Sequence, residues 1–277
     1  MGVLEGKVAF ISGGARGQGR SHAVRMAEEG ADIITFDVCE PVFDSVAYAQ
    51  STQADLDETV KLVEGLDRRI VALKADVRDQ DAVQAVLDEG LAEFGRVDIV
   101  VANAGIMPII GEKAAARQAW HDAVDVMLTG VLHTCEAAIP TLVEQGEGGS
   151  ISITSSVAGL KGPIRTLGVK TDGYLGYIAA KHGVVGLMRA YANALGPYRI
   201  RCNTVHPTGV NSPMVVNPEF AAAAQELPEM REAAINALPI NLIEPVDISN
   251  AIIHLASDAG RYTTGLTMTV DGGATIY

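Results

Sequence analysis

The sequence predicts one α/β domain, in which a doubly wound, mostly parallel sheet carries helices on both faces. Short apolar runs rich in β-branched residues alternate with longer amphipathic stretches along all 277 residues. This repeated strand–helix–strand order is typical of a parallel sheet. No linker, strong repeat or low-complexity run divides the sequence, and 48% of its residues are hydrophobic, enough for a full core. We therefore expect a single domain over residues 1–277.

Seven short apolar runs are the expected strands, because their nearly continuous β-branched composition is typical of strands covered on both faces. They are residues 8–11, 32–36, 70–73, 99–102, 151–153, 200–205 and 266–270. Helical spacing predicts helices over residues 17–29, 79–94, 122–139, 177–195 and 247–256. Gly30 and Gly95 follow two of these helices, where a left-handed cap favours glycine.

Two segments interrupt this alternation. Residues 38–56 insert a loop after the second strand, and residues 208–239 form a long stretch that ends in an Ala-rich helix. A long excursion near the carboxyl edge of a sheet often covers a ligand. Residues 208–239 are therefore expected to form either a lid over the substrate or an extra packed helix pair.

Charge and cysteine content exclude several classes of protein. The chain has 21 Lys and Arg against 34 Asp and Glu, a net charge of −13, which argues against partners such as nucleic acid or an anionic membrane. Its three cysteines and six histidines form no metal-ligand spacing, so no metal is expected. The sequence lacks a signal-peptide pattern and a continuous apolar run of about 18 residues. We expect a cytoplasmic protein without a spanning helix.

Glycines recur where the first strand turns into the first helix, in the run SGGARGQG of residues 12–19. Such glycines let the backbone turn sharply and approach a pyrophosphate, which the helix N-terminus stabilises. The run therefore predicts a dinucleotide site. The residues expected to contact the cofactor here are Gly13, Arg16, Gly17, Gln18 and Gly19.

Asp37 ends the second strand, 18 residues after Gly19. A carboxylate at this place accepts hydrogen bonds from both adenosine ribose hydroxyls and repels a 2′-phosphate, so it favours NAD over NADP. Arg16 is the alternative, because a basic residue in the glycine loop can bind that phosphate. We expect Asp37 to dominate and NAD to be the cofactor.

Further polar and small residues follow the third, fourth and fifth strands. Since the carboxyl ends of parallel strands meet at one edge, these residues are expected to line the same crevice. They are Asp76 and Val77, then Asn103, Ala104 and Gly105, then Ser155 and Ser156.

Tyr177 and Lys181 are four residues apart within a predicted helix and therefore share one face. An ammonium about 5 Å from a phenol contributes roughly 3 kcal/mol, which would lower the phenol's pKa by about two units. We therefore expect Lys181 to make Tyr177 a useful acid or base near neutral pH.

Taken in order, these motifs make the chain resemble a one-domain short-chain dehydrogenase/reductase of the Rossmann type, over essentially its full length. Further segments that carry the resemblance are Pro207-Thr208-Gly209 and Val270-Asp271-Gly272-Gly273. The resemblance implies that Tyr177 is the acid/base, that Lys181 also binds the nicotinamide ribose, and that Ser156 holds the substrate oxygen. It also implies cofactor contacts from Pro207, Thr208 and Ser212, and a homotetramer.

A narrower resemblance, to the carveol-dehydrogenase-like, mycofactocin-associated subgroup, is carried by several short segments. They are Gly17-Gln18-Gly19-Arg20-Ser21-His22, the insertion after Asp37, Lys181-His182-Gly183-Val184-Val185-Gly186 and His206-Pro207-Thr208. This resemblance implies that NAD is held tightly and reoxidised in place by a redox partner. It also implies that the substrate is an apolar or alicyclic secondary alcohol, which is converted to its ketone.

The sequence departs from the family pattern at two places. Met127 stands where the family has an asparagine that carries a water-linked proton relay, and methionine cannot relay protons. Ser156 and Tyr177 are 21 residues apart, more than is usual in the family, so we expect a bulge over residues 160–176 at the substrate pocket. These departures leave a second hypothesis open, that the chain is an NAD(H)-binding regulatory or scaffold protein with little turnover.

Overall fold

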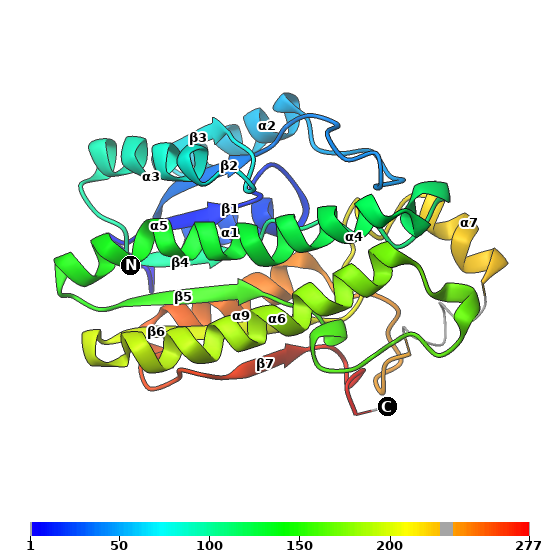
Figure 1. Cartoon of the computed structure of the whole chain (residues 1–277). Helices are drawn as coiled ribbons and strands as arrows, with labels where there is room; N and C mark the ends of the chain where they lie inside the picture. Colours follow the sequence, from blue (N-terminus) through cyan, green and yellow to red (C-terminus); the bar gives the residue numbers. More distant parts are fainter. Residues whose placement is uncertain (1, 228–234, 277) are drawn as a thin grey trace.

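The computed structural model describes residues 2–227 and 235–276. Seven strands form one parallel sheet in the order β3-β2-β1-β4-β5-β6-β7 (Figure 1). The strands are β1 (Val8–Ser12), β2 (Asp32–Asp37), β3 (Ile70–Lys74), β4 (Ile99–Ala102), β5 (Gly149–Thr154), β6 (Ile200–Pro207) and β7 (Thr267–Val270). The strand order reverses between β1 and β4, and that reversal places a ligand crevice at their carboxyl ends.

The predicted strands are all present, and most extend one or two residues beyond the apolar runs. Their polar end residues still take part in the parallel ladder, since Asp37 at the end of β2 pairs with Lys74 at the end of β3. Apolar content alone therefore underestimates the strand length at the carboxyl edge, where the functional residues lie.

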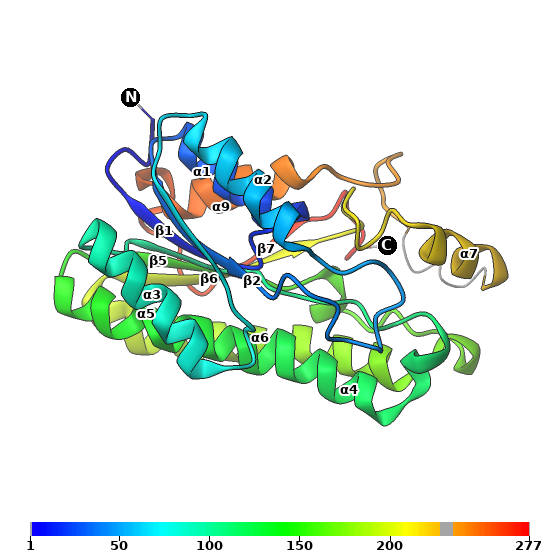
Figure 2. The ribbon, with the colours of Figure 1, turned by 90° about the horizontal axis from the view of Figure 1, so that it is seen from above.

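Helices cover both faces of the sheet, which confirms the doubly wound fold (Figure 2). On one face lie α1 (Gly17–Glu28), α2 (Gln53–Glu64) and α9 (Pro245–Ala256), with α1 packed on both α2 and α9. On the other lie α3 (Gln80–Phe94), α4 (Arg117–Val124), α5 (Gly130–Gln145) and α6 (Asp172–Leu195). A large apolar cluster fills the space on each side of the sheet.

A π-helical segment, η2 (Asp125–Thr129), joins α4 to α5, so that Arg117–Gln145 is one long helix. Among the described residues, this helix is long and apolar enough to cross a membrane, by length and composition alone. Half of its most apolar stretch is buried inside the protein. It packs on α3 and α6 as a core helix of the domain.

The prediction of a loop over residues 38–56 is wrong at its end, because α2 begins at Gln53. Thr52 and Asp55 form a capping box there: the Thr52 hydroxyl accepts from the Asp55 amide, and the Asp55 carboxylate accepts from the Thr52 amide. A polar residue followed three positions later by an acid is an N-terminus signal that the sequence contains.

The Ala-rich helix expected within residues 208–239 is α7 (Pro218–Glu226), which lies beyond the carboxyl ends of the strands (Figure 1). Asn217 caps it by accepting a hydrogen bond from the Phe220 amide at 2.7 Å. Met214, Val215 and Phe220 pack against the core on the α5–α6 side. Residues 228–234 of the predicted lid lie outside the described residues.

Candidate active site

The turn after β1 brings the glycine loop against the end of β4. Gly13 has a φ of +75°, and a Cβ on it would lie 2.8 Å from the Ala104 Cα. A Cβ on Gly19 would lie 1.9 Å from the Gly13 carbonyl oxygen. Within the described residues, no side chain caps the N-terminus of α1, and its first turn contains no acidic residue. Its N–H groups are therefore free to bind an anion.

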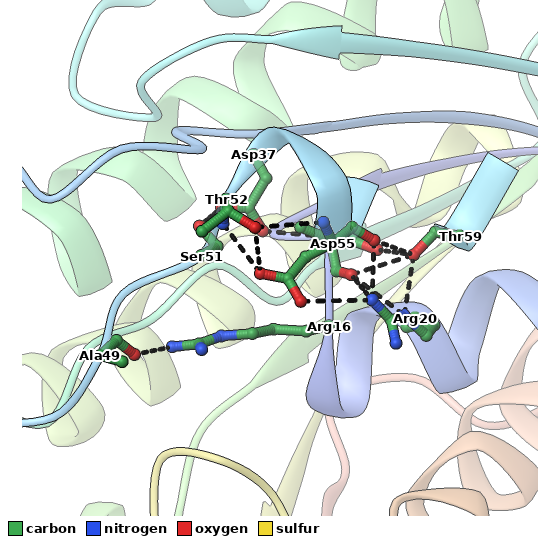
Figure 3. Close-up of polar contacts among 10 residues, drawn as sticks. Arg16, Arg20, Asp37, Ala49, Ser51, Thr52, Asp55 and Thr59 are labelled. Atoms are coloured by element: carbon green, nitrogen blue, oxygen red, sulfur yellow. Dashed lines mark hydrogen bonds and ion pairs between the residues drawn. The ribbon is translucent and has the colours of Figure 1, made fainter. Parts of the chain in front are cut away.

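Asp37, at the end of β2, holds the glycine loop and the following loop together. One carboxylate oxygen accepts a hydrogen bond from the Ala15 amide at 3.0 Å, and the other accepts from the Ser51 hydroxyl at 2.6 Å. The Arg16 side chain points toward the Ala49 carbonyl, to which it donates a hydrogen bond (Figure 3). Asp37 and Arg16 thus reach the same loop at different places.

A pocket of about 930 Å³, counted with its open mouth, lies at the strand reversal between β1 and β4. Most of the predicted cofactor residues line it: Gly13, Arg16, Gly17, Gln18, Gly19, Asp37, Asp76, Val77, Asn103, Ala104, Gly105 and Ser212. The predicted residues Pro207, Thr208, Tyr177 and Lys181 are not among its lining residues. Residues that sequence reasoning missed also line it: Phe36, Val38, Phe43, Tyr48, Gln50, Ser51, Ala75, Ile106, Val126, Pro213 and Met214.

Asp76 forms an ion pair with Arg78 on one side of the pocket. The two side chains approach to 2.5 Å, and the Arg78 amide also donates to the Asp76 carboxylate at 2.9 Å. Burial raises the pKa of Asp76, but the hydrogen bonds from Arg78 outweigh it and hold that pKa below its usual value. The Arg78 guanidinium in turn lies over the Phe43 ring, 4.5 Å from its centroid.

Asn103 supports the glycine loop from the end of β4. Its side-chain amide donates to the carbonyl oxygens of Ser12 at 3.1 Å and Gly13 at 3.3 Å. Its oxygen accepts from the Thr154 hydroxyl at 3.4 Å, which links β4 to β5. The side chain thus fixes the wall of the pocket.

The two serines after β5 have different surroundings. Ser155 donates its hydroxyl hydrogen bond to the Lys181 carbonyl oxygen at 2.8 Å and so anchors α6. The Ser156 hydroxyl accepts from the Ala158 amide at 3.1 Å and lies close enough to the Tyr177 phenol to lower the pKa of that phenol. Of the pair, Ser156 is therefore the one whose hydroxyl meets the phenol.

Lys181 lies one helical turn after Tyr177, with its ammonium nitrogen 5.9 Å from the centre of the phenol ring. The ammonium donates a hydrogen bond to the Thr154 carbonyl oxygen at 2.8 Å. Thr154 also contacts Asn103, which lines the pocket. The structure thus brings Ser156, Tyr177 and Lys181 together beside the pocket.

Burial controls the pKa values of this group. It raises the pKa of Tyr177 above its ordinary value, although the Ser156 side chain acts in the opposite direction. Burial also lowers the pKa of Lys181 to about 8. The prediction of a lowered Tyr177 pKa is therefore wrong for the protein groups alone, because desolvation of the phenol is the largest influence on it.

The residues after β6 reach the same edge. Pro207 ends β6, and Thr208 donates its amide to the Val270 carbonyl oxygen at 3.4 Å and its hydroxyl to Asn236 at 2.8 Å. Ser212 lies opposite the glycine loop, with its Cβ 3.5 Å from where a Cβ on Gly17 would be. Across the described residues, no group of three or more His, Cys, Asp or Glu side chains is placed to hold a metal ion.

Comparisons with known proteins agree with this geometry. A family model described as enoyl-(acyl carrier protein) reductase matches residues 13–275. The chain belongs to the short-chain dehydrogenase/reductase family. It is 44% identical to (−)-trans-carveol dehydrogenase of Rhodococcus erythropolis, over 100% of both chains.

Two solved structures of this family resemble the chain over its full length. Carveol dehydrogenase from Mycobacterium avium in complex with NAD has a TM-score of 0.91 and 45% identity, with 100% of each chain covered. A short chain dehydrogenase from Mycobacterium paratuberculosis bound to NAD has a TM-score of 0.91 and 43% identity, also with 100% of each chain covered. The resemblance to carveol dehydrogenases predicted from sequence is thus confirmed.

This short-chain dehydrogenase/reductase has a loop, residues 38–52, that extends from the cofactor pocket to α4. Within it, Ser45 donates a buried hydrogen bond to Asp122 at 2.5 Å. The Tyr48 hydroxyl accepts from the Met107 amide at 3.1 Å, also in a buried place. The sequence marks the loop by its length and position, but its contacts come from parts of the chain too distant for a pattern to reveal.

The two departures from the family pattern, Met127 and the extra residues before Tyr177, lie in η2 and in the segment that leads into α6. Met127 is fully buried in the π-helical segment η2, and its sulfur would be 3.7 Å from a Cβ on Gly105. The extra residues before Tyr177 form the short helix η4 (Leu167–Val169) and an early start of α6, capped by Thr171. Leu167 is 86% exposed, so part of this insertion projects from the surface.

Proposed function

We propose that this short-chain dehydrogenase/reductase uses NAD to interconvert an apolar or alicyclic secondary alcohol and its ketone. The observation that carries the proposal is the meeting of Ser156, Tyr177 and Lys181 beside the pocket lined by the glycine loop and Asp37. A phenol, a hydroxyl and an ammonium in this arrangement can bind an alcohol oxygen and move its proton.

The pocket residues fit NAD. The uncapped first turn of α1 offers N–H groups to a pyrophosphate, and the close approach at Gly13 and Gly19 leaves room only for backbone there. Asp37 would accept hydrogen bonds from the adenosine ribose and would repel a 2′-phosphate. The buried Oε1 atom of Gln18 has no hydrogen-bond partner among the described residues, so it is free to accept a hydrogen bond from the cofactor.

The resemblance to short-chain dehydrogenases/reductases supports an assignment of the residues that would hold the nicotinamide half of NAD. Lys181 would hold the nicotinamide ribose, and Ser212, with Pro207 and Thr208, would hold the carboxamide. Bound NAD supplies the acceptor for the hydride that leaves the alcohol carbon. The protein's own residues orient the alcohol and manage its proton.

In alcohol oxidation, the Ser156 hydroxyl donates a hydrogen bond to the substrate oxygen, and Tyr177 as phenolate takes the hydroxyl proton. Lys181 would stabilise that phenolate by its charge while it is protonated, and its own pKa of about 8 sets the pH range of this effect. Because burial raises the pKa of Tyr177, the neutral phenol predominates at neutral pH and is ready to protonate a ketone oxygen. The oxidation rate is therefore expected to rise with pH, and the reduction rate to fall at high pH.

The loop of residues 38–52 supports tight retention of NAD. It lines the pocket through Phe43, Tyr48 and Ser51, and Ser45 fastens it to Asp122 on α4. An ordered loop over a bound cofactor slows its release. Retained NADH then needs an electron acceptor at the protein surface, so we include a redox partner in the proposal.

An alcohol panel tests the proposed function. Purified protein is mixed with NAD or NADP and with (−)-trans-carveol, cyclohexanol, 2-octanol or a 3-hydroxyacyl thioester, and NADH absorbance is followed, including absorbance of NADH that stays bound. The proposal predicts fastest reduction of NAD with the cyclic alcohols. Preference for the thioester would contradict the substrate class, whereas NAD binding without turnover on any alcohol would favour a regulatory or scaffold role.

A further inference from the structure

His206 lies one residue before the end of β6 and is fully buried. Its Nδ1 atom is 2.8 Å from the Ser156 carbonyl oxygen, and its Nε2 atom is 2.7 Å from the Thr204 hydroxyl. Thr204 and His206 share one face of the strand, because side chains alternate along it. Both ring nitrogens therefore have a partner, and one of those partners is the backbone of the proposed catalytic serine.

The chemistry of the two partners fixes the tautomer of His206. A carbonyl oxygen only accepts hydrogen bonds, so Nδ1 carries a hydrogen. Nε2 then accepts from the Thr204 hydroxyl, whose other acceptor, the Leu266 carbonyl oxygen, is farther away at 3.5 Å. If Nε2 also carried a hydrogen and donated it to the Thr204 hydroxyl, the ring would be a buried cation.

The charges around His206 favour the neutral ring. Burial is the largest influence and lowers its pKa, and the charges of Lys181 and His182 lower it further. The hydrogen bond to Ser156 and the charge of Asp271 act in the opposite direction without reversing the shift. The neutral Nδ1–H form is thus the one that the surroundings stabilise.

The contact begins where the sheet ladder between β5 and β6 ends. The last backbone bond of that ladder region runs from the Ser155 amide to the Val205 carbonyl oxygen at 2.9 Å. One residue further, the imidazole of His206 replaces the backbone donor and holds the Ser156 carbonyl. The backbone of Ser156 is then fixed from both sides, since Gly159 also donates to the same carbonyl at 2.8 Å.

We propose that His206, oriented by Thr204, is a positioning residue that fixes Ser156 so that its hydroxyl faces Tyr177 and the substrate oxygen. The inference rests on the proposed function of Ser156 and adds the device that holds it in place. His206 acts through Ser156, because its ring nitrogens hydrogen-bond to the Ser156 carbonyl oxygen and the Thr204 hydroxyl.

Variants of His206 test the inference, with the alcohol that the panel finds fastest as the probe. His206→Leu removes the donor to Ser156, whereas the amide nitrogen of His206→Asn takes the place of Nδ1. Misplacement of a reacting group by about 1 Å costs on the order of 100-fold in rate. We expect His206→Leu to lower kcat by roughly 10- to 100-fold with an unchanged NAD Kd, and His206→Asn to recover most of the loss.

A double-mutant cycle separates positioning from a general structural effect. In a Ser156→Ala background no hydroxyl remains to be positioned, so His206→Leu should change the residual kcat by no more than about 2-fold. An equal loss in both backgrounds would overturn the inference. Should His206→Leu fail to fold, Thr204→Val, with Thr204→Ser as its matched control, removes the orienting hydroxyl and should give a smaller fall in kcat.

Nitrogen-15 NMR of histidine-labelled protein provides a measurement besides activity. It should show His206 as the Nδ1–H tautomer at pH 7, and Thr204→Val should weaken that preference. A cation or an Nε2–H tautomer would overturn the inference. If the unaltered protein turns over no alcohol, both the proposed function and the role of His206 are wrong. If the unaltered protein turns over an alcohol and His206→Leu does so at the same rate, only the role of His206 is wrong.

Discussion

Single residues at this site carry both structural and chemical tasks. Asp37 holds the Ala15 amide and the Ser51 hydroxyl while its carboxylate faces the pocket. Lys181 is buried at 4% exposure and donates to the Thr154 carbonyl, although an ammonium is costly to bury. The sequence predicts which residues these are, because strand ends and helical spacing are visible in it. Burial is not visible, so the sequence could not predict that the pKa of Tyr177 is raised.

Replacing Asp37 with alanine tests cofactor choice. The change removes the carboxylate that would bind the ribose hydroxyls and repel a 2′-phosphate, so NAD should bind more weakly and the gap between NAD and NADP should narrow. Titration calorimetry measures both affinities, with Asp55→Asn, outside the pocket lining, as the control. Equal or tighter binding of NADP by the unaltered protein would contradict the assignment and favour Arg16.

Replacing Lys181 with methionine tests its buried charge through stability. Its pKa of about 8 in the folded protein lies below the ordinary value of 10.5, so the unfolded chain binds more protons between these two pH values. The stability of the unaltered protein therefore gains with pH across that window. Below pH 8, Lys181→Met should therefore have a higher free energy of unfolding than the unaltered protein. This difference should decrease by up to about 3 kcal/mol as the pH rises to 10.5.

Urea unfolding at several pH values from 7 to about 10 measures this difference. Only the difference between the two proteins is compared, because buried cysteines and tyrosines also titrate at high pH in both. A difference that does not change with pH would mean that Lys181 ionises as it does in the unfolded chain.

At the scale of elements, the joint between α4 and α5 differs most from regular geometry. The helix passes through the π-helical segment η2, which contains Met127, and such segments are frequent at functional sites. Apolar periodicity predicts a helix over residues 122–139 but gives no sign of a local change of pitch. The prediction was correct in type and missed the feature that faces the pocket.

Replacing Met127 with asparagine tests the missing proton relay. An amide at this position could hold a water that leads from Lys181 toward solvent, so turnover limited by proton transfer should rise. Small buffer bases should also accelerate the unaltered enzyme. Loss of a buried methionine costs roughly 2–5 kcal/mol of stability, so thermal unfolding of the variant is measured first. A folded variant with an unchanged rate, together with no effect of buffer, would mean that the relay never limits turnover.

Strands were easier to predict than helices in this chain. Each strand is a compact apolar run, whereas α2 buries only Leu56, Thr59 and Val63 among twelve residues, which is too sparse a pattern to outweigh the preceding loop. The α6 helix begins at Asp172, five residues before the predicted start, because Thr171 caps it. Local capping thus decided the boundaries that apolar periodicity could not.

At the scale of the whole molecule, the parallel sheet brings together residues that are far apart in sequence. The glycine loop, Asp37, Asp76, Asn103 and Ser156 all lie at or just beyond the carboxyl ends of strands, so one edge of the sheet brings them together. This much follows from the order of motifs and was predictable. The contacts of the loop of residues 38–52, the stacking of Arg78 on Phe43 and the contact of His206 with Ser156 depend on packing between distant segments. The homotetramer, the cytoplasmic location and the redox partner stay predictions.

In the proposed reaction, Tyr177 accepts the proton of an alcohol that NAD oxidises at this edge of the sheet. Single-turnover oxidation of the fastest panel alcohol by Tyr177→Phe tests it most directly, with Tyr191→Phe, on the same helix but hydrogen-bonded to Glu136, as the matched control. We expect a rate lower by about 10²–10⁴ for Tyr177→Phe, an unchanged NAD affinity, and a normal rate for the control. A near-normal rate in Tyr177→Phe would contradict it.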